Sequence, residues 1–159
     1  MERHAKVMIA TDGTDASVRA AAVARGLFGT EATYTFVHVE DSAGVGTQPV
    51  IGVPGAGAAA PATLAESAPT ETADEVAERG RAIAGRSAYE AGMANAVAVG
   101  LIGDPAPTLA AEAAHRGVDV IVAPGDPAKG WFSKLFSSST AAELERVATV
   151  PVLVVPTPG

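Results

Sequence analysis

The sequence predicts an α/β domain in which a doubly wound, mainly parallel sheet of five strands is joined to four helices. Short apolar runs of strand length alternate along the chain with longer segments whose apolar residues recur at helical spacing. Parallel strands need crossover connections, which are right-handed and are usually supplied by helices. The chain of 159 residues also has the length of one domain. We therefore expect a single domain over residues 1–159, although the pattern alone does not reveal the order of the strands.

The first two strands and the helix between them are predicted from the first quarter of the chain. Residues 7–11 form a short apolar run that ends at Asp12-Gly13, and residues 33–40 are rich in β-branched and aromatic side chains. Between these runs, apolar residues recur at i, i+3, i+4, i+7 and i+8, as on one face of a helix. Residues 42–69 show neither the helical spacing nor the alternation typical of a strand, and they are rich in Gly, Ala and Pro. We expect a mobile, flexible loop there, because little apolar surface opposes the entropy of ordering it.

The third strand is predicted between two further helices. Residues 70–91 keep helical spacing, and residues 96–102 form the next apolar run. Asp104 and Pro105 follow as a candidate N-cap and first helical residue. Gly117 is expected to end the helix that Pro105 begins, because glycine readily adopts the left-handed conformation found there.

The last third of the chain contains a strand, a loop, a helix and a strand in that order. Residues 118–123 form an apolar run that breaks at Gly125, and residues 137–140, Ser-Ser-Ser-Thr, open a short helix over 140–148. The final strand is Val152–Val155. Backbone N–H groups of a glycine-containing loop and of a first helical turn have no intrahelical partners, and the helix dipole favours negative charge there. The segment between the two strands is therefore a candidate phosphate site.

Charge and composition exclude several classes of function. The formal net charge of −7 argues against binding to nucleic acid or to an anionic membrane, both of which need clustered Lys and Arg. The absence of cysteine excludes disulfides, thiolate zinc sites and a cysteine nucleophile. The N-terminus shows no signal-peptide pattern, and no run approaches the about 20 apolar residues that span a bilayer. We expect a cytoplasmic protein with no nucleic-acid and no membrane partner.

No constellation for catalysis or for metal binding is evident in the sequence. His4, His38 and His115 are not spaced as metal ligands and are interpreted as surface or structural residues. The aspartates form no obvious acid–base pair, and neither a Gly-x-Ser-x-Gly elbow nor a Gly-x4-Gly-Lys-Ser/Thr loop occurs. We therefore predict no catalytic and no metal-ligating residue, and a protein that acts by binding rather than turnover. Slow ATP hydrolysis stays open as an alternative for which the sequence shows no general base.

Six segments in a fixed order resemble the universal stress protein family. They are KVMIATDG at 6–13, FVHVED at 36–41, GDP at 103–105, RGVDVIV at 116–122, the loop at Gly125, and PVLVVP at 151–156. The resemblance covers nearly the whole chain and implies the strand order 3-2-1-4-5. This order would place the ends of the first and fourth strands side by side at the switch point, so that Asp12 and Gly125 face one crevice.

The resemblance further implies a site for ATP or another adenine nucleotide. Thr11 and Asp12, with the adjoining Gly13, match the family residues near the ribose and adenine, and Val39 matches the position whose backbone meets the adenine edge. ATP-binding members carry a loop of the form Gly, two residues, Gly, nine residues, Gly, then Ser or Thr. The candidate binding residues are Thr11, Asp12, Gly13, Val39, Gly125, Ala128, Gly130, Ser138, Ser139 and Thr140.

The phosphate loop departs from the family motif. Of its four slots only Gly125 and Ser139 match, because Ala128 and Ser138 replace glycines. Asp126 adds negative charge next to the first glycine, Pro127 removes an N–H donor, and Lys129, Gly130 and Lys134 partly offset these losses. The sequence leaves open whether nucleotide binding is retained or lost, and predicts that the adenosine half of the site survives better than the phosphate half.

Each candidate residue also has an ordinary structural interpretation. Asp12-Gly13 can be a turn that starts a helix, with Thr14 or Asp15 as its cap. Val39 can be a core valine. Thr140 and Glu143 have the spacing of a capping box, which would satisfy N–H groups of the helix but leave others free for a ligand.

Two surfaces are candidates for protein partners. Val152–Val155 is an apolar final strand, and in the family that it resembles this sheet edge pairs with its two-fold mate, so a homodimer is expected. A second candidate is a cluster of large side chains, unusual in a chain with only 4% aromatic residues: Trp131, Phe132 and Phe136. These side chains are interpreted as a lid over the site, as a contact with a protein partner, or as residues that pack on the last helix. A nucleotide-independent, homodimeric partner-binding module is therefore the alternative function.

Overall fold

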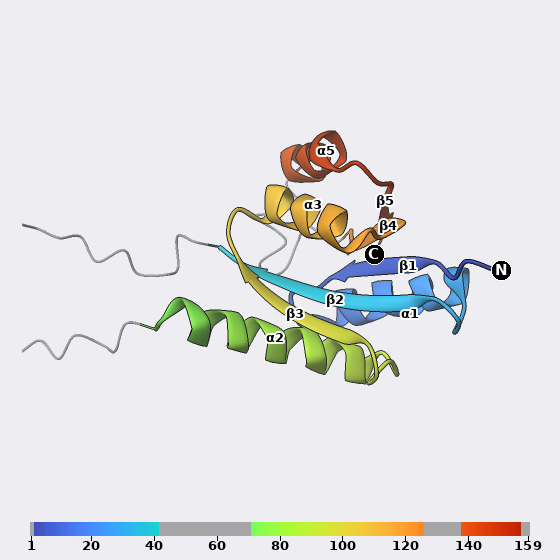
Figure 1. The fold of residues 1–159 in the computed structure, drawn as a ribbon, viewed down its shortest axis with the longest axis horizontal. Helices are drawn as coiled ribbons and strands as arrows, with labels where there is room; N and C mark the ends of the chain where they lie inside the picture. Colours follow the sequence, from blue (N-terminus) through green and yellow to red (C-terminus); the bar gives the residue numbers. More distant parts are fainter. Residues whose placement is uncertain (1, 42–70, 126–137, 157–159) are drawn as a thin grey trace, which may run out of the picture.

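The computed structural model describes residues 2–41, 71–125 and 138–156, which form a layered α/β structure (Figure 1). All nine predicted elements are present, in the predicted order. The predicted mobile loop at 42–69 lies outside the described residues. The elements are β1 (Lys6–Ala10), α1 (Asp15–Phe28), β2 (Thr33–Glu40), α2 (Ala73–Glu90), β3 (Val97–Ile102), α3 (Pro105–Arg116), β4 (Val120–Pro124), α5 (Ser138–Val147) and β5 (Val152–Val155).

The five strands form one sheet in the order β3-β2-β1-β4-β5, and every neighbouring pair is parallel. This confirms both the predicted fold class and the strand order that the family resemblance implies. Ile9 in β1 pairs with Phe36 in β2 on one side and with Val122 in β4 on the other. The winding reverses between β1 and β4, so the carboxyl ends of these two strands flank the position where ligands bind in open α/β sheets.

Two helices cover each face of the sheet, and a separate apolar core fills each gap. Alternate strand residues point to opposite faces, so Ile9 and Phe36 join the core under α1 and α2, whereas Met8 and Val37 join the core under α3 and α5. Figure 1 shows α3 and α5 on one side of the sheet and α2 on the other. Alanines supply most of the buried helix residues, which lets the helices lie close to the strands.

Two glycines allow α2 to pack backbone against backbone on β3. A Cβ atom at Gly100 would lie 2.0 Å from the Ala77 carbonyl oxygen and 2.4 Å from the Arg81 nitrogen. A Cβ at Gly80 would lie 3.2 Å from the Gly100 Cα and 3.2 Å from His38 Cδ2. Gly80, in the middle of α2, lowers helix stability by about 1 kcal/mol relative to alanine, but it is needed because a larger residue would not fit against β3. The contact places α2 directly over His38.

The helix ends meet the predicted signals in part. Gly117 has φ +62° and ends α3 as expected. Asp104 occupies the N-cap position of α3, but its side chain makes no capping hydrogen bond. Helix α5 begins at Ser138, two residues before the predicted start, so Thr140 lies inside the first turn and not at the N-cap that a capping box requires. A capping box that the sequence analysis missed joins Thr72 and Glu75 at the start of α2.

Candidate functional site

The predicted binding residues that the structure describes follow β1 and β4, lie near the end of β2, or lie at the start of α5. Thr11, Asp12 and Gly13 follow β1, and Gly125 follows β4, which is the direct neighbour of β1 in the sheet. Val39 lies near the end of β2. The start of α5 supplies Ser138, Ser139 and Thr140. Ala128 and Gly130 of the candidate site, and the aromatic residues Trp131, Phe132 and Phe136, lie outside the described residues.

The turn between β1 and α1 satisfies its own backbone donors. Asp12 N–H donates to Ser17 Oγ at 3.2 Å, Gly13 N–H to Thr11 Oγ1 at 3.0 Å, and Thr14 N–H to Asp12 Oδ1 at 3.0 Å. An anion site made from backbone groups needs free N–H donors. The N–H groups of Asp12, Gly13 and Thr14 are therefore not free to bind phosphate.

The Asp12 carboxylate is anchored through one of its two oxygens. Besides the Thr14 N–H, Oδ1 accepts hydrogen bonds from Thr14 Oγ1 and, at 2.7 Å, from Ser17 Oγ. Oδ2 accepts no hydrogen bond from any residue in the described part of the chain. The side chain is thus fixed in orientation while it keeps a charged acceptor available to a hydroxyl-bearing ligand.

Glycine is required at position 13 for two reasons. Its φ is +81°, a conformation that residues with a side chain rarely adopt. A Cβ there would also lie 3.0 Å from Ile83 Cγ2 and 3.2 Å from an Arg86 guanidinium nitrogen. Helix α2 therefore closes one wall of the turn, and it brings the exposed Arg86 cation beside Gly13.

Gly125 is required by packing and not by a left-handed conformation. Its N–H donates to the Val155 carbonyl oxygen at 2.7 Å, so this donor is already used in the hydrogen bonding between the paired strands β4 and β5. A Cβ would lie 2.9 Å from Val154 Cγ1 and 3.1 Å from the Val155 oxygen. The N–H groups of Ser138 and Ser139, in the first turn of α5, have no intrahelical partners and form the positive end of the helix dipole.

The comparison with protein families agrees with this arrangement. The model of the universal stress protein family matches residues 4–156. The chain belongs to the universal stress protein family. No curated protein matches the sequence significantly.

Solved structures of universal stress proteins share the fold. A universal stress protein in complex with cAMP superposes with a TM-score of 0.59 at 18% identity, over 99% of this chain and 100% of that chain. The hypothetical protein MJ0577 gives a TM-score of 0.65 at 15% identity, over 98% of each chain. A family protein from Burkholderia pseudomallei gives 0.57 at 21% identity, over 97% of each chain.

Beneath the turn, this universal stress protein carries a buried polar cluster that the sequence analysis did not anticipate. Thr11 Oγ1 and Ser87 Oγ lie 2.7 Å apart, and His38 Nδ1 lies 2.9 Å from the Thr11 carbonyl oxygen. Each of these three residues is at most 3% exposed. His38 is thus a structural histidine, as interpreted from the sequence. Ser17, Ser87 and Arg86 carried no local signal, because they reach the turn only through tertiary packing.

Val39 contributes its side chain to the core. It is 1% exposed, lies under α3 and α5, and pairs through its backbone with Leu101 of β3. This packing fits the interpretation of Val39 as a core valine. The contact of its backbone with the adenine edge stays a prediction.

Within residues 2–41, 71–125 and 138–156, no group of three His, Asp or Glu side chains is arranged to hold a metal ion. No helix in those ranges is long and apolar enough to cross a membrane.

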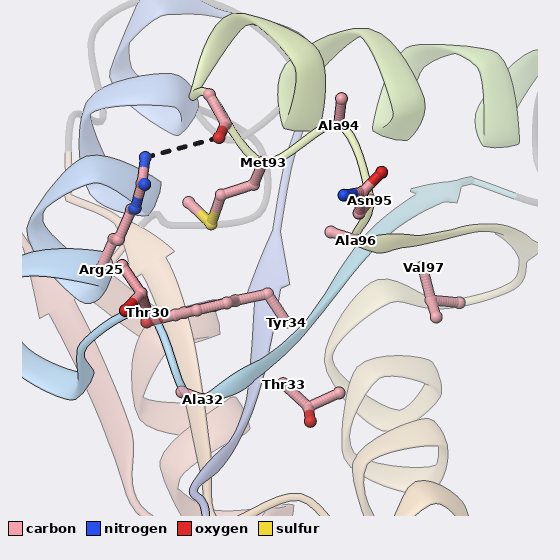
Figure 2. A pocket seen from close by; sticks show the side chains of 11 residues that line it. Arg25, Thr30, Ala32, Thr33, Tyr34, Met93, Ala94, Asn95, Ala96 and Val97 are labelled. Atoms are coloured by element: carbon pink, nitrogen blue, oxygen red, sulfur yellow. Dashed lines mark hydrogen bonds between the residues drawn. The ribbon is translucent and has the colours of Figure 1, made fainter.

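A cavity of about 280 Å³ lies at the other end of the sheet, by the amino ends of β2 and β3. Figure 2 shows Arg25, Tyr34 and Met93 converging on it. Arg25 donates to the Gly92 carbonyl oxygen at 3.4 Å and so ties the end of α1 to the turn before β3. None of the described residues that line this cavity is a predicted nucleotide-binding residue.

Proposed function

We propose that this protein binds an adenine nucleotide at the carboxyl ends of β1 and β4 and acts by binding rather than turnover. The observation that carries the proposal is the geometry of Asp12. Its Oδ1 is held by Thr14 and Ser17, which leaves Oδ2 to accept from ribose hydroxyls. Hydrogen bonds to a charged acceptor are roughly twice as strong as neutral ones, and a side chain fixed in advance loses little entropy on binding.

The preferred ligand is a nucleotide with a single phosphate, such as AMP or cAMP. The N–H groups of the β1–α1 turn and of Gly125 are already used, and Ala128 and Ser138 replace two glycines of the phosphate motif. The first turn of α5 remains as a donor site, which suits one phosphate better than three. The relative solved with cAMP also holds a mononucleotide.

Calorimetric titration with AMP, cAMP, ADP and ATP tests the proposal. We expect the protein to bind AMP or cAMP with an affinity within tenfold of that for ATP, a gap of less than about 1.4 kcal/mol. ATP binding at least tenfold tighter than AMP binding would show that the phosphate loop is complete.

The substitution Asp12→Asn isolates the second oxygen of Asp12. An asparagine Oδ1 still accepts from Thr14 and Ser17, whereas its amide nitrogen puts a donor where the ribose acceptor was. We expect at least about tenfold weaker binding of every adenine nucleotide, or about 1.4 kcal/mol. Asp15→Asn, at an exposed position in the first turn of α1, is the matched control and should change affinity little. Equal affinities of the Asp12→Asn variant and the unmodified protein would refute the site.

The alternative is a nucleotide-independent homodimer that acts by binding a protein partner. The exposure of Val154, 36% on a strand at the edge of the sheet, favours this alternative. Unpaired edge strands are usually covered or paired. A dimer that binds none of the four nucleotides would select this alternative over the first proposal.

A further inference from the structure

A second pocket lies at the amino ends of β1, β2 and β3, beside the last turn of α3. Its volume is about 350 Å³, and small-molecule sites range from about 300 to 1,000 Å³. None of the described residues that line it belongs to the proposed nucleotide site, which lies at the carboxyl ends of the strands.

The strand register shows how the sheet builds the floor of this pocket. Thr33 and Thr35 point to the same face of β2 as Val37, which joins the core under α3 and α5. Thr33 pairs with Lys6 of β1, and Thr35 pairs with Val97 of β3. Two hydroxyl groups therefore lie between a cationic and an apolar side chain on one surface.

The charged side chains that line the pocket are basic, in a chain whose formal net charge is −7. They are Lys6, His115 and Arg116, and no acidic residue is among the described lining. Arg116 is paired with Glu112 at 2.5 Å, whereas the Lys6 side chain makes no ion pair with any residue that the structure describes. The nearby Asp119, which accepts from the Lys6 N–H at 2.8 Å, is paired with Arg3.

The positions of these cations differ in what they do for the fold. His115 and Arg116 lie in the last turn of α3, where a positive charge offsets the negative end of the helix dipole. Lys6 lies at the start of a strand and has no such role. Its ammonium group therefore keeps three hydrogen-bond donors and an uncompensated charge for a ligand.

The hydroxyl group of Thr35 points to a ligand independently of the charges. Thr35 is only 7% exposed, and its hydroxyl makes no hydrogen bond with any of the described residues. Within those residues, no side-chain oxygen or nitrogen is both completely buried and without a partner. The Thr35 oxygen must therefore open into the pocket that the residue lines. Buried polar groups are nearly always hydrogen-bonded, so this hydroxyl lacks the partner that a ligand in the pocket would supply.

We propose that this pocket binds a small phosphate monoester, with its phosphate group on Lys6 and Thr35 and its organic part on Val97. The Lys6 ammonium, the hydroxyls of the two threonines and the Arg116 donors outside its ion pair form a three-dimensional set of donors. Such a set suits the three acceptor oxygens of a phosphate better than the two oxygens of a planar carboxylate. Val97 is 47% exposed and supplies an apolar surface next to Thr35.

Phenyl phosphate is the probe, titrated into nitrogen-15-labelled protein at constant ionic strength and followed by NMR. We expect saturable shifts of the Lys6, Thr35 and Val97 amide resonances. Phenol, which lacks the phosphate, and benzoate, which carries a planar anion, should each bind at least about tenfold more weakly. Benzoate that binds as tightly as phenyl phosphate, or shifts confined to Asp12 and Gly13, would overturn the proposal.

The variant Thr35→Val separates ligand binding from a structural role of the hydroxyl. It keeps the β-branched shape and removes a group that has no partner in the described structure, so the free energy of unfolding should stay the same or rise. Phenyl phosphate should bind at least about tenfold more weakly, because a hydrogen bond to a charged group is lost. A Thr35→Val protein that is less stable in urea denaturation would show that the hydroxyl serves the fold, and would overturn the proposal.

Lys6→Gln tests the cation, and Arg19→Gln is its matched control. Arg19 is exposed on α1, which covers the opposite face of the sheet, and its replacement removes the same charge from the chain. We expect Lys6→Gln to weaken phenyl phosphate binding at least about tenfold and Arg19→Gln to change it little. Equal weakening by both would indicate attraction by the charge of the whole protein and exclude a built site. Because the probe contains no nucleoside and its shifts are read at Lys6, Thr35 and Val97, these outcomes do not depend on the proposed nucleotide site.

Discussion

Asp12 and Ser17 hydrogen-bond to each other in both directions. Ser17 Oγ accepts from the Asp12 N–H and donates to Asp12 Oδ1. The serine is fully buried in the first turn of α1, five residues after the aspartate. The pair couples the start of the helix to the orientation of the proposed ribose acceptor, so its loss should affect both stability and binding.

Ser17→Ala tests this coupling. The substitution leaves the Asp12 N–H without a partner and releases Oδ1 from one of its three donors. We expect a loss of about 1–3 kcal/mol in the free energy of unfolding, the cost of an unsatisfied buried polar group, and weaker adenosine binding. Urea denaturation and calorimetry measure the two effects. Thr30→Ala removes a hydroxyl from an exposed loop position and should alter neither, and a stable Ser17→Ala variant would contradict the role given to the serine.

Ionisation of Tyr34 makes the free energy of unfolding depend on pH in the alkaline range. Burial raises the pKa of its phenol, although the charge of Arg25 acts in the opposite direction. Below about pH 10, the ordinary tyrosine pKa, both the folded and the unfolded state keep the proton. Above that pH the unfolded chain releases it first, so the folded state holds more protons and stability falls as pH rises.

Tyr34→Phe should therefore lose less stability between pH 8 and pH 11 than the unmodified protein does. At neutral pH the variant should be about 1 kcal/mol less stable, because the hydrogen bond from Tyr34 to the Gly29 carbonyl oxygen at 2.6 Å is lost. Urea denaturation across this pH range measures both effects. Tyr89, which is 74% exposed, provides the control: Tyr89→Phe should leave the alkaline decline unchanged.

At the scale of elements, the sequence predicts β2 and β5 with their observed bounds, because dense β-branched residues and clear turn signals flank both. The observed bounds of α5 and β4 differ from the predicted ones by up to two residues. At α5 the reason is that several polar residues in a row fit either a loop or a first helical turn. At the candidate site, the sequence pattern after β1 singles out Asp12 and Gly13 as candidate binding residues. The same pattern does not indicate that Ser87 and His38 lie beneath the turn, because the contact of Ser87 with Thr11 depends on how α2 crosses the sheet and that of His38 on the pairing of β1 with β2.

The crossing of α2 over β3 predicts opposite effects for two glycines on the same helix. Gly→Ala gains up to about 1 kcal/mol of helix propensity at either position. At Gly85 the new Cβ would be 3.8 Å from the Ala98 Cβ, an ordinary contact, so Gly85→Ala should raise the free energy of unfolding. At Gly80 it would lie 3.2 Å from the Gly100 Cα and from His38. Gly80→Ala should therefore cancel the gain or lower stability.

The two variants differ in one further respect. Because Gly80 contacts the His38 ring, Gly80→Ala should also shift the imidazole resonances, whereas Gly85→Ala should leave them in place. Denaturant unfolding and NMR of the two proteins provide the comparison. Equal stabilisation by both substitutions would mean that α2 lies farther from β3 than described.

At the scale of the whole molecule, β3 and β5 are the two edge strands of the sheet, and both carry an exposed valine, Val97 at 47% and Val154 at 36%. Helix α2 packs along β3, whereas β5 contains only four residues and pairs with β4 on one side. Within β5, Leu153 and Val155 pack into the core under α1, and Val154 is 36% exposed. Within the part of the chain that the structure describes, only β4 pairs with β5, so this apolar edge and its exposed valine suit isologous pairing with β5 of a second copy.

Val154→Lys tests this edge without disturbing the core that Leu153 and Val155 join. We expect the unmodified protein to be a dimer at micromolar concentration, and Val154→Lys to shift it toward the monomer, because two lysines would face each other across the two-fold axis and charge discourages edge pairing. Light scattering across a concentration series measures the assembly. Val23→Lys, at a 38% exposed position on α1, introduces the same charge away from the edge and should leave the dimer intact. A monomeric unmodified protein would exclude this interface. A dimer that withstands Val154→Lys but is split by Val23→Lys would place the interface on the helical face instead.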